Sequence, residues 1–255
     1  RRPPLRRVTI GEASDYLALR RTAAPKMALA TMLCIFSPIA LIGLAAVSEL
    51  SASAFPLREG VAAGIGLCAL LILVAIAVVL FMDCGNKAKE YEFLEKEPFE
   101  TEYGVTGMVK ERQKAFKPTY DHMNTIGTVL CVLSFVPLFA VMAVIQDGFF
   151  MTMAVCLLLA VVGIGVYFFV YGGTIYSSME KLLEEGDYTR REKSQKNITG
   201  PVSVIYWLVA TAIFMIYTFG PKGNGQPRYS WIIWAVAGVL YAAVLAGIKL
   251  IRNRK

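Results

Sequence analysis

Six long stretches without a single Asp, Glu, Lys or Arg constrain the fold of this chain more than any other feature. They cover residues 27–48, 61–82, 123–146, 148–179, 197–221 and 229–248. A helix of about 20 apolar residues crosses the hydrocarbon core of a bilayer. One charged residue at the centre of a span would cost about 2.5–3.5 kcal/mol on insertion scales. The absence of charged residues from all six stretches therefore indicates that they lie in a membrane. The sequence therefore predicts six transmembrane helices.

The composition points to the same class of protein. Of the 255 residues, 56% are hydrophobic and 18% are charged, and the mean hydropathy is +0.54. An ordinary globular chain carries about 25% charged residues. The charges also crowd into the gaps between the apolar stretches, which is typical of a multi-pass membrane protein.

The positive charges predict the orientation in the membrane. Residues 1–26, 83–122, 180–196 and 249–255 hold 23 of the 26 Lys and Arg residues. Positive residues near the ends of spans stay on the cytoplasmic side, so we expect a plasma-membrane protein with both termini in the cytoplasm. The net charge of +7 would then face the anionic inner leaflet, which we expect to be a partner.

An internal repeat groups the spans in pairs. The strings LCIFSP (33–38) and LCVLSFVP (130–137) align at an offset of 97, and Cys68 aligns with Cys156 at an offset of 88. We therefore expect an all-α fold of three repeated two-helix hairpins. The hairpins are residues 27–82, 123–179 and 197–255, and the last one shares few identities and carries a basic tail. Parallel repeats occur in some transporters, although duplication alone also produces them.

The cytoplasmic segments have the pattern of helices. We expect a short amphipathic helix in residues 1–26, a helical connector in 83–122 and a further connector in 180–196. Thr9 with Glu12, and Thr189 with Glu192, have the spacing of a capping box. Residues 87–97 read as a charged extension of the second span that ends at Pro98.

One amphipathic pattern in the middle connector defines a candidate site, either a cytoplasmic relay or a helix on the membrane surface. Its apolar positions and one arginine recur at helical spacing, and three lysines fall on other faces. The residues are Val105, Met108, Val109, Arg112 and Phe116, with Lys110, Lys114 and Lys117. The alternative is a connector that only completes the fold.

Residue types that carry reaction chemistry are scarce. His122 is the only histidine, which excludes histidine-based metal sites and catalytic triads, and no phosphate-loop or zinc-protease motif occurs. The middle of each apolar stretch lacks the ionisable residues on which ion-driven carriers depend. The five cysteines lie in spans or at their inner boundary, where we expect packing roles. We therefore expect no enzyme activity, no metal and no cofactor.

Two serine and proline pairs in the spans are candidate hinges or cavity-lining positions. They are Ser37 with Pro38, and Ser134 with Pro137. Proline removes a backbone hydrogen bond, and a nearby hydroxyl can satisfy the carbonyl that is left free. A static bend is the alternative interpretation. Small residues, among them Gly60, Gly64, Gly163, Gly165 and the Ala/Gly positions of 235–247, are expected at close helix contacts.

Several strings resemble the membrane half of Xre-type helix-turn-helix regulators of Gram-positive bacteria. They are FLEKEPF (93–99), YGVTGMV (103–109), TVLCVLS (128–134) with Pro137-Leu138, and RVTIGEA (7–13) with Tyr16-Leu17. The resemblance extends over about residues 7–176 and implies a cytoplasmic DNA-binding domain ahead of several spans. Only 26 residues precede the first span here, so this domain would lie upstream of Arg1, or the chain is a stand-alone relative. The resemblance assigns no role to any single residue.

These observations lead to one functional expectation and its alternatives. We expect a non-enzymatic membrane anchor and sensor that relays a membrane or small-molecule signal to a DNA-binding domain in cis, with a homodimer as one assembly. The alternative is a small transporter or permease-like subunit, which the parallel repeat and the paired prolines favour. A membrane-embedded enzyme is the weakest interpretation, because no span carries a nucleophile–base or metal-binding pair. The sequence does not identify the ligand.

Overall fold

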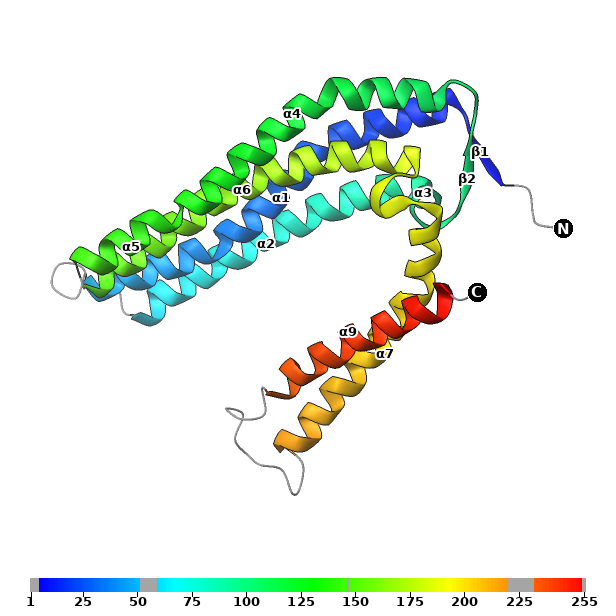
Figure 1. The fold of residues 1–255 in the computed structure, drawn as a ribbon. Coiled ribbons are helices and arrows are strands. Elements are labelled where there is room, and N and C mark those ends of the chain that lie inside the picture. The colour runs from blue at the N-terminus through cyan, green and yellow to red at the C-terminus, as the bar shows by residue number, and fades with distance from the viewer. Residues whose placement is uncertain (1–4, 51–58, 146, 220–231, 254–255) are drawn as a thin grey trace. The chain divides into compact units, whose positions relative to one another are not determined.

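A computed structural model describes residues 5–50, 59–145, 147–219 and 232–253 of the chain (Figure 1). Nearly all of these residues are helical, so the all-α class that the sequence predicts is confirmed. The chain divides into two compact units, Arg1–Tyr188 and Thr189–Lys255, which are described separately. We refer to them as unit 1 and unit 2.

Unit 1 consists of four long helical arms that run antiparallel in succession (Figure 1). The first two arms are α1 (Ile10–Leu50) and α2 (Glu59–Ala88). The third is α4 (Val105–Leu133), which α5 (Phe135–Val144) extends, and the fourth is α6 (Gly148–Leu183). Helices α1 and α6 form the inner pair; α2 packs on α1, and α4 and α5 pack on α6.

Short elements join the arms at one end of unit 1. The chain passes from α2 through η2 (Lys89–Tyr91), α3 (Phe93–Lys96) and β2 (Phe99–Thr101) to α4, and η3 (Gly186–Tyr188) follows α6. Strand β1 (Arg6–Val8) precedes α1 and pairs in parallel with β2. As predicted, the helical extension of the second span ends before Pro98, although it is broken into short turns. The strand pair is a feature that the sequence did not predict.

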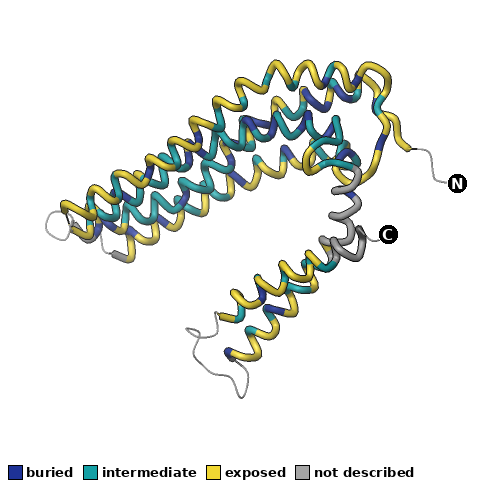
Figure 2. Tube along the Cα trace, viewed as in Figure 1, coloured by how far each residue is buried: buried dark blue, intermediate teal, exposed yellow. Residues whose placement is uncertain are grey.

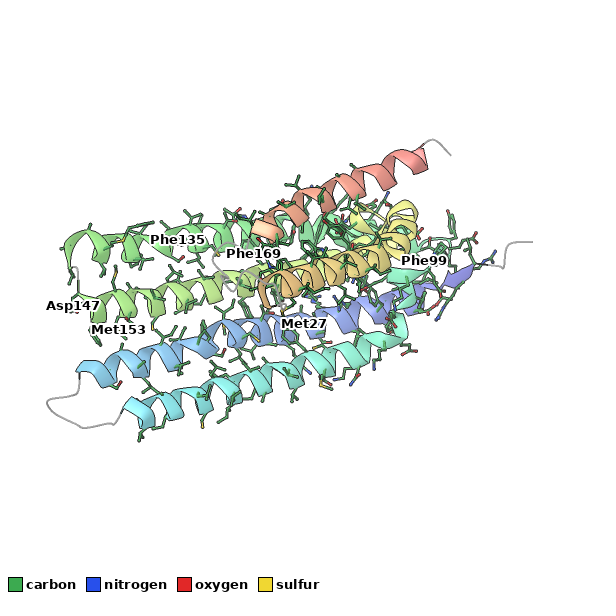
Figure 3. All side chains as sticks on the ribbon, turned by 90° about the horizontal axis from the view of Figure 1, so that it is seen from below. Met27, Phe99, Phe135, Asp147, Met153 and Phe169 are labelled. Atoms are coloured by element: carbon green, nitrogen blue, oxygen red, sulfur yellow. The ribbon has the colours of Figure 1, made fainter. Side chains whose placement is uncertain are left out.

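The helices are continuous across boundaries that the sequence analysis placed between segments. The expected short helix in residues 1–26 and the first apolar stretch form one helix, α1, and α4 likewise joins the middle connector to the third stretch. Residues 10–26 of α1 extend about 25 Å at 1.5 Å per residue. Figure 3 shows Phe99 at one end of the long helices and Asp147 at the opposite end. Met27, where the first apolar stretch begins, lies between these two ends, so α1 continues beyond the apolar stretch toward the end that holds Phe99.

All four arms of unit 1 are long and apolar enough to cross a membrane. The qualifying stretches are Ile10–Ser48, Gly60–Tyr91, Val105–Val144 and Gly148–Leu183. Exposed residues run along the arms (Figure 2). Many of them are large and apolar, such as Leu71, Ile72 and Val79 of α2. Apolar surface of this extent in a water-soluble protein would be a liability, whereas lipid covers it at no cost. The fold is therefore compatible with a membrane protein.

Glycines allow α6 to pack closely against both of its neighbours. A Cβ atom at Gly163 would collide with the Phe36 ring of α1. A Cβ atom at Gly165 would lie 2.9 Å from Cys131 Sγ of α4 and 3.0 Å from the Gly127 carbonyl oxygen. Both positions were predicted as close contacts. Around Gly60 and Gly64 the structure instead leaves open space.

Unit 2 is a hairpin of α7 (Arg190–Phe219) and α9 (Ile232–Asn253). Aromatic contacts join the two helices: the rings of Trp207 and Trp234 stack with centroids 5.9 Å apart. The Tyr206 hydroxyl donates a hydrogen bond to the Ala237 carbonyl oxygen over 2.6 Å. The apolar stretches are shorter here, Val202–Thr218 and Ile232–Gly247. The fifth and sixth spans therefore stay predictions, and both predicted stretches include residues outside the described part of the chain.

Candidate functional site

The ends of the arms that carry most of the charged residues of unit 1 meet in one buried core. We call this region the charged end and define it as residues 5–26, 83–122 and 174–188. The core comprises Val8, Ala13, Tyr16, Leu17, Ala24, Leu94, Phe99, Val105, Val109, Ile175, Met179 and Leu182. Its members come from β1, α1, α3, β2, α4 and α6, and η2, which follows α2, adds the half-buried Tyr91. The charged end is thus a folded region with its own core, formed by the ends of the arms together with the short elements that connect them.

The start of α1 is fixed to strand β1. The Glu12 backbone N–H donates to Thr9 Oγ1 over 3.2 Å, so the Thr9 half of the predicted capping box is confirmed. The Glu12 carboxylate accepts a hydrogen bond of 2.6 Å from the Arg6 guanidinium, which also lies 3.8 Å from the centroid of the Phe93 ring. A charge-assisted bond of this kind is stronger than a neutral one. The cap therefore links β1, α1 and α3.

The start of α4 is fixed in a different way. Gly104 lies between β2 and α4 with φ +97°, a left-handed conformation that glycine adopts without strain. This turn places Val105 and Val109 in the core, where both are fully buried. The two parallel strands, β1 and β2, thus each lead directly into a long arm.

Lys181 of α6 is a buried cation in the charged end. It is 5% exposed and forms an ion pair with Glu95 of α3. Its Nζ atom also lies 5.0 Å from the ring centroid of Tyr188. Burial raises the pKa of Tyr188, and the nearby Glu95 carboxylate raises it further. A buried ammonium group needs such partners because its desolvation is costly.

A cavity of about 630 Å³ opens between α1, α4 and α6 at the charged end. We call it the α1–α4–α6 cavity. Its lining residues are Ser14, Leu17, Ala18, Arg21, Arg112, Ala115, Phe116, Tyr171, Ile175, Ser178 and Met179. The lining is mainly apolar, and two arginines provide its charge. The volume falls within the range of small-molecule sites, about 300–1,000 Å³.

The structure divides the residues of the predicted relay or membrane-surface helix among three environments. Val105 and Val109 are buried in the core, and Met108 and Phe116 pack against it. Arg112 and Phe116 line the cavity. Lys110, Lys114 and Lys117 are exposed, and Lys110 Nζ lies 3.8 Å from a Glu185 carboxylate oxygen. The apolar face of this part of α4 therefore packs against unit 1 itself.

The serine and proline pairs lie in the apolar part of the arms, and neither lines the α1–α4–α6 cavity. Ser37 Oγ donates a hydrogen bond of 2.8 Å to the Cys34 carbonyl oxygen, the acceptor that Pro38 leaves without its N–H partner.

The second pair differs in geometry. Ser134 Oγ donates a hydrogen bond of 2.6 Å to the Cys131 carbonyl oxygen. Helix α4 ends at Leu133, whose carbonyl receives no hydrogen bond from Pro137 because proline has no backbone N–H. Whether either bend acts as a hinge stays a prediction.

Sequence reasoning did not find Arg21, Tyr171 or the pair of Lys181 with Glu95. Arg21 follows Ser14, Leu17 and Ala18 at helical spacing, so a shared face of α1 could have been noticed. The residues of α6 lie about 150 positions later in the chain, and only the fold shows that they face α1 and α4. The described residues contain no group of three or more His, Cys, Asp or Glu side chains that could hold a metal ion.

Comparisons of the chain with protein-family models, with curated proteins and with solved structures find no match.

Proposed function

We propose that this chain is a non-enzymatic membrane anchor and sensor of a transcriptional regulator. A change in the packing of the membrane helices would pass through the charged end to a DNA-binding domain ahead of Arg1. One observation carries the proposal: strand β1 shares a single buried core with the ends of α1, α4 and α6. Any domain attached before β1 would be joined directly to that core.

The packing of the core makes a relay physically reasonable. Protein interiors are close-packed, so a shift of α6 against α1 must be taken up by neighbouring side chains. Such shifts at helix interfaces are a known form of switching. Val8 of β1 and Met179 of α6 both belong to this core. A movement of α6 would therefore bear on β1, provided that the signal favours one of the two arrangements.

The resemblance to Xre-type regulators fits this location. The strings that carry it supply much of the charged-end core, including Leu94, Phe99, Val105 and Val109. The resemblance therefore concerns the part of the chain that we propose as the relay.

The proposed membrane arrangement completes the account. The protein would lie in the plasma membrane with six spans in three hairpins and with both termini in the cytoplasm. The clustering of charged segments at one end of unit 1 supports this orientation, because positive residues remain on the cytoplasmic side. It would also bring the basic residues close to anionic lipids.

The proposal is tested in the organism by replacing the membrane part of the gene. One strain carries the native gene, a second carries the upstream segment fused to an unrelated multi-span anchor, and a third carries the upstream segment alone. Transcripts are measured before and after a membrane perturbation. We expect a response only with the native chain. An equal response from the fusion to the unrelated anchor would contradict the sensor function and leave only an anchor.

The second candidate is a transporter. It is favoured by the junction of α4 and α5 at Ser134, where the helix stays continuous but Pro137 removes one backbone hydrogen bond, because locally weakened membrane helices form substrate sites in several transporter folds. Proteoliposomes containing the protein would be incubated with the small-molecule extract of the cell, and their contents analysed by mass spectrometry. Accumulation of a compound over empty liposomes would favour transport, whereas a sensor requires no flux.

A further inference from the structure

We propose that the α1–α4–α6 cavity binds an amphiphile with an anionic head, such as a phosphate-headed lipid. The head would lie at Arg21 and Arg112, and the apolar part would lie along α6. This inference names a ligand for the sensor proposed above, and it rests on that proposed function only for the consequence of binding.

The two arginines provide the charge complementarity. Arg21 comes from α1 and Arg112 from α4, and neither forms an ion pair with any described residue. Seven other cations of the charged end have carboxylate partners within 4 Å, namely Arg6, Arg7, Lys26, Lys87, Lys96, Lys110 and Lys181. Arg20, Lys89, Lys114 and Lys117 also form no ion pair with a described residue, so the shared cavity, and not the lack of a partner, distinguishes the two exposed arginines. None of the described residues that line the cavity is acidic. A guanidinium pair of this kind matches the geometry of phosphate or carboxylate groups.

The remaining lining is suited to an apolar chain. Tyr171, Ile175 and Met179 of α6 follow one another by one helical turn each, and Leu17 and Phe116 line the same cavity from α1 and α4. Because Leu17, Ile175 and Met179 are already largely buried in the core, the half-buried Tyr171 and Phe116 offer most of the apolar surface that these five side chains leave open. A purely ionic ligand such as free phosphate would leave this apolar surface unused. An amphiphile would cover it, which favours binding.

The position of the cavity matches the level at which lipid headgroups lie. Arg21 precedes the first apolar stretch, which begins at Met27, whereas Tyr171 lies inside the fourth stretch. The cavity therefore spans the boundary between the apolar arms and the charged end. Arginine and tyrosine are both favoured at this interface.

Binding would act on α1 and α4, the two helices that directly follow the paired strands. Strand β1 leads into α1 and strand β2 leads into α4. A head held by Arg21 and Arg112 together would tie α1 to α4 and so stabilise one arrangement of the charged end. This gives the relay a ligand that binds its two arrangements with different affinity, as any shift requires.

The test is a thermal unfolding titration of the full chain in a neutral detergent. The probes are dioleoyl phosphatidylglycerol, dioleoyl phosphatidylcholine and inorganic phosphate. We expect saturable stabilisation by phosphatidylglycerol alone. The variant Arg21→Gln/Arg112→Gln should raise the lipid concentration for half-maximal effect by about tenfold or more. The matched control Lys114→Gln/Lys117→Gln removes the same charge from exposed positions on α4 outside the cavity, and should change that concentration less than about twofold.

A variant with unchanged charge covers the case in which the arginine variant does not fold. Ala115→Trp fills the cavity from an exposed position and should abolish stabilisation by phosphatidylglycerol. Stabilisation of this variant equal to that of the wild type would overturn the proposal. The proposal would also be overturned if the double arginine variant and the double lysine variant lost the same amount of stabilisation by phosphatidylglycerol. Full stabilisation by inorganic phosphate would overturn it as well.

These results separate the site from the function. The titration measures binding alone, whereas the transcript experiment measures regulation. If the native chain binds phosphatidylglycerol but transcripts do not respond, the sensor function is contradicted. If transcripts still respond with the Arg21→Gln/Arg112→Gln variant, which no longer binds the lipid, this lipid is not the signal.

Discussion

Lys181 of α6 forms an ion pair with Glu95 of α3, a residue 86 positions earlier in the chain. The Lys181 side chain is 7% exposed and the Glu95 side chain is 51% exposed, so the cation is the buried partner. Since α3 belongs to the connector between α2 and α4, the pair fastens this connector to the fourth arm. The charged end therefore holds its connector by electrostatics as well as by apolar packing.

Loss of the Glu95 carboxylate should destabilise unit 1. In the variant Glu95→Gln, the buried Lys181 ammonium loses the Glu95 carboxylate and keeps only a weaker neutral contact with residue 95, and we expect a cost of about 1–2 kcal/mol in the free energy of unfolding. The measurement is an SDS titration of the protein in detergent. The matched control is Glu100→Gln, which removes an exposed carboxylate 3.9 Å from Arg7 and should cost less than about 0.5 kcal/mol. Equal costs for the two variants would show that the Lys181 pair does not stabilise the charged end.

The hydroxyl of Ser37 should matter only while Pro38 is present. Ser37→Ala leaves the Cys34 carbonyl without its donor, and we expect a loss of about 0.5–1.5 kcal/mol. In the Pro38→Ala background the residue 38 N–H can bond to that carbonyl, so the same change should cost almost nothing. A double-mutant cycle measures this difference. The same cost in both backgrounds would contradict the assignment.

Gly165 should not tolerate even a methyl group. Gly165→Ala places a Cβ atom 2.9 Å from Cys131 Sγ, and separating α4 from α6 should cost about 1–3 kcal/mol. Gly173 lies on the same helix, and a Cβ atom added there would have no neighbouring atom within 4 Å. Gly173→Ala is therefore the control, and it should be neutral or slightly stabilising because alanine favours the helix. The SDS titration compares the two variants, and a stable Gly165→Ala protein would argue against the close contact.

The orientation is tested with single cysteines at the two ends of unit 1. In a chain whose five cysteines are replaced by alanine, Tyr103→Cys reports on the charged end and Asp147→Cys on the opposite end. Tyr103 is fully exposed. In intact spheroplasts a membrane-impermeant maleimide should label position 147 and spare position 103, and permeabilisation should expose both. Labelling of position 103 alone would reverse the orientation, and labelling of both would contradict a spanning unit.

The features that could be predicted from the sequence depend on neighbours in the chain. The apolar stretches predicted the long arms, Thr9 predicted the cap of α1, and Pro98 predicted the end of the helical extension. Each is set by residues within a few positions. The strand pair was missed because three residues such as Phe99–Thr101 are too short to show an alternating pattern.

The candidate site was only partly predictable, because it is made of contacts between distant residues. The spacing of Val105, Met108 and Val109 correctly indicated an apolar helix face. The same spacing suits a face against lipid and a face against protein, so the sequence could not show that this face packs on α6 and into the core of the charged end. To predict the cavity one must know how three helices are rotated about their own axes. To predict the pair of Lys181 with Glu95 one must know the fold, because the two residues lie far apart in the sequence.

The central claim, a membrane sensor joined to a DNA-binding domain, is tested most directly by the intact mass of the protein expressed from its own gene, with peptide mapping of its N-terminus. We expect a product that extends upstream of Arg1 by about 50 residues or more, the lower limit of an independent domain, with a basic helical sequence. A product that begins within a few residues of Arg1 would contradict the regulator and leave the transporter as the leading function.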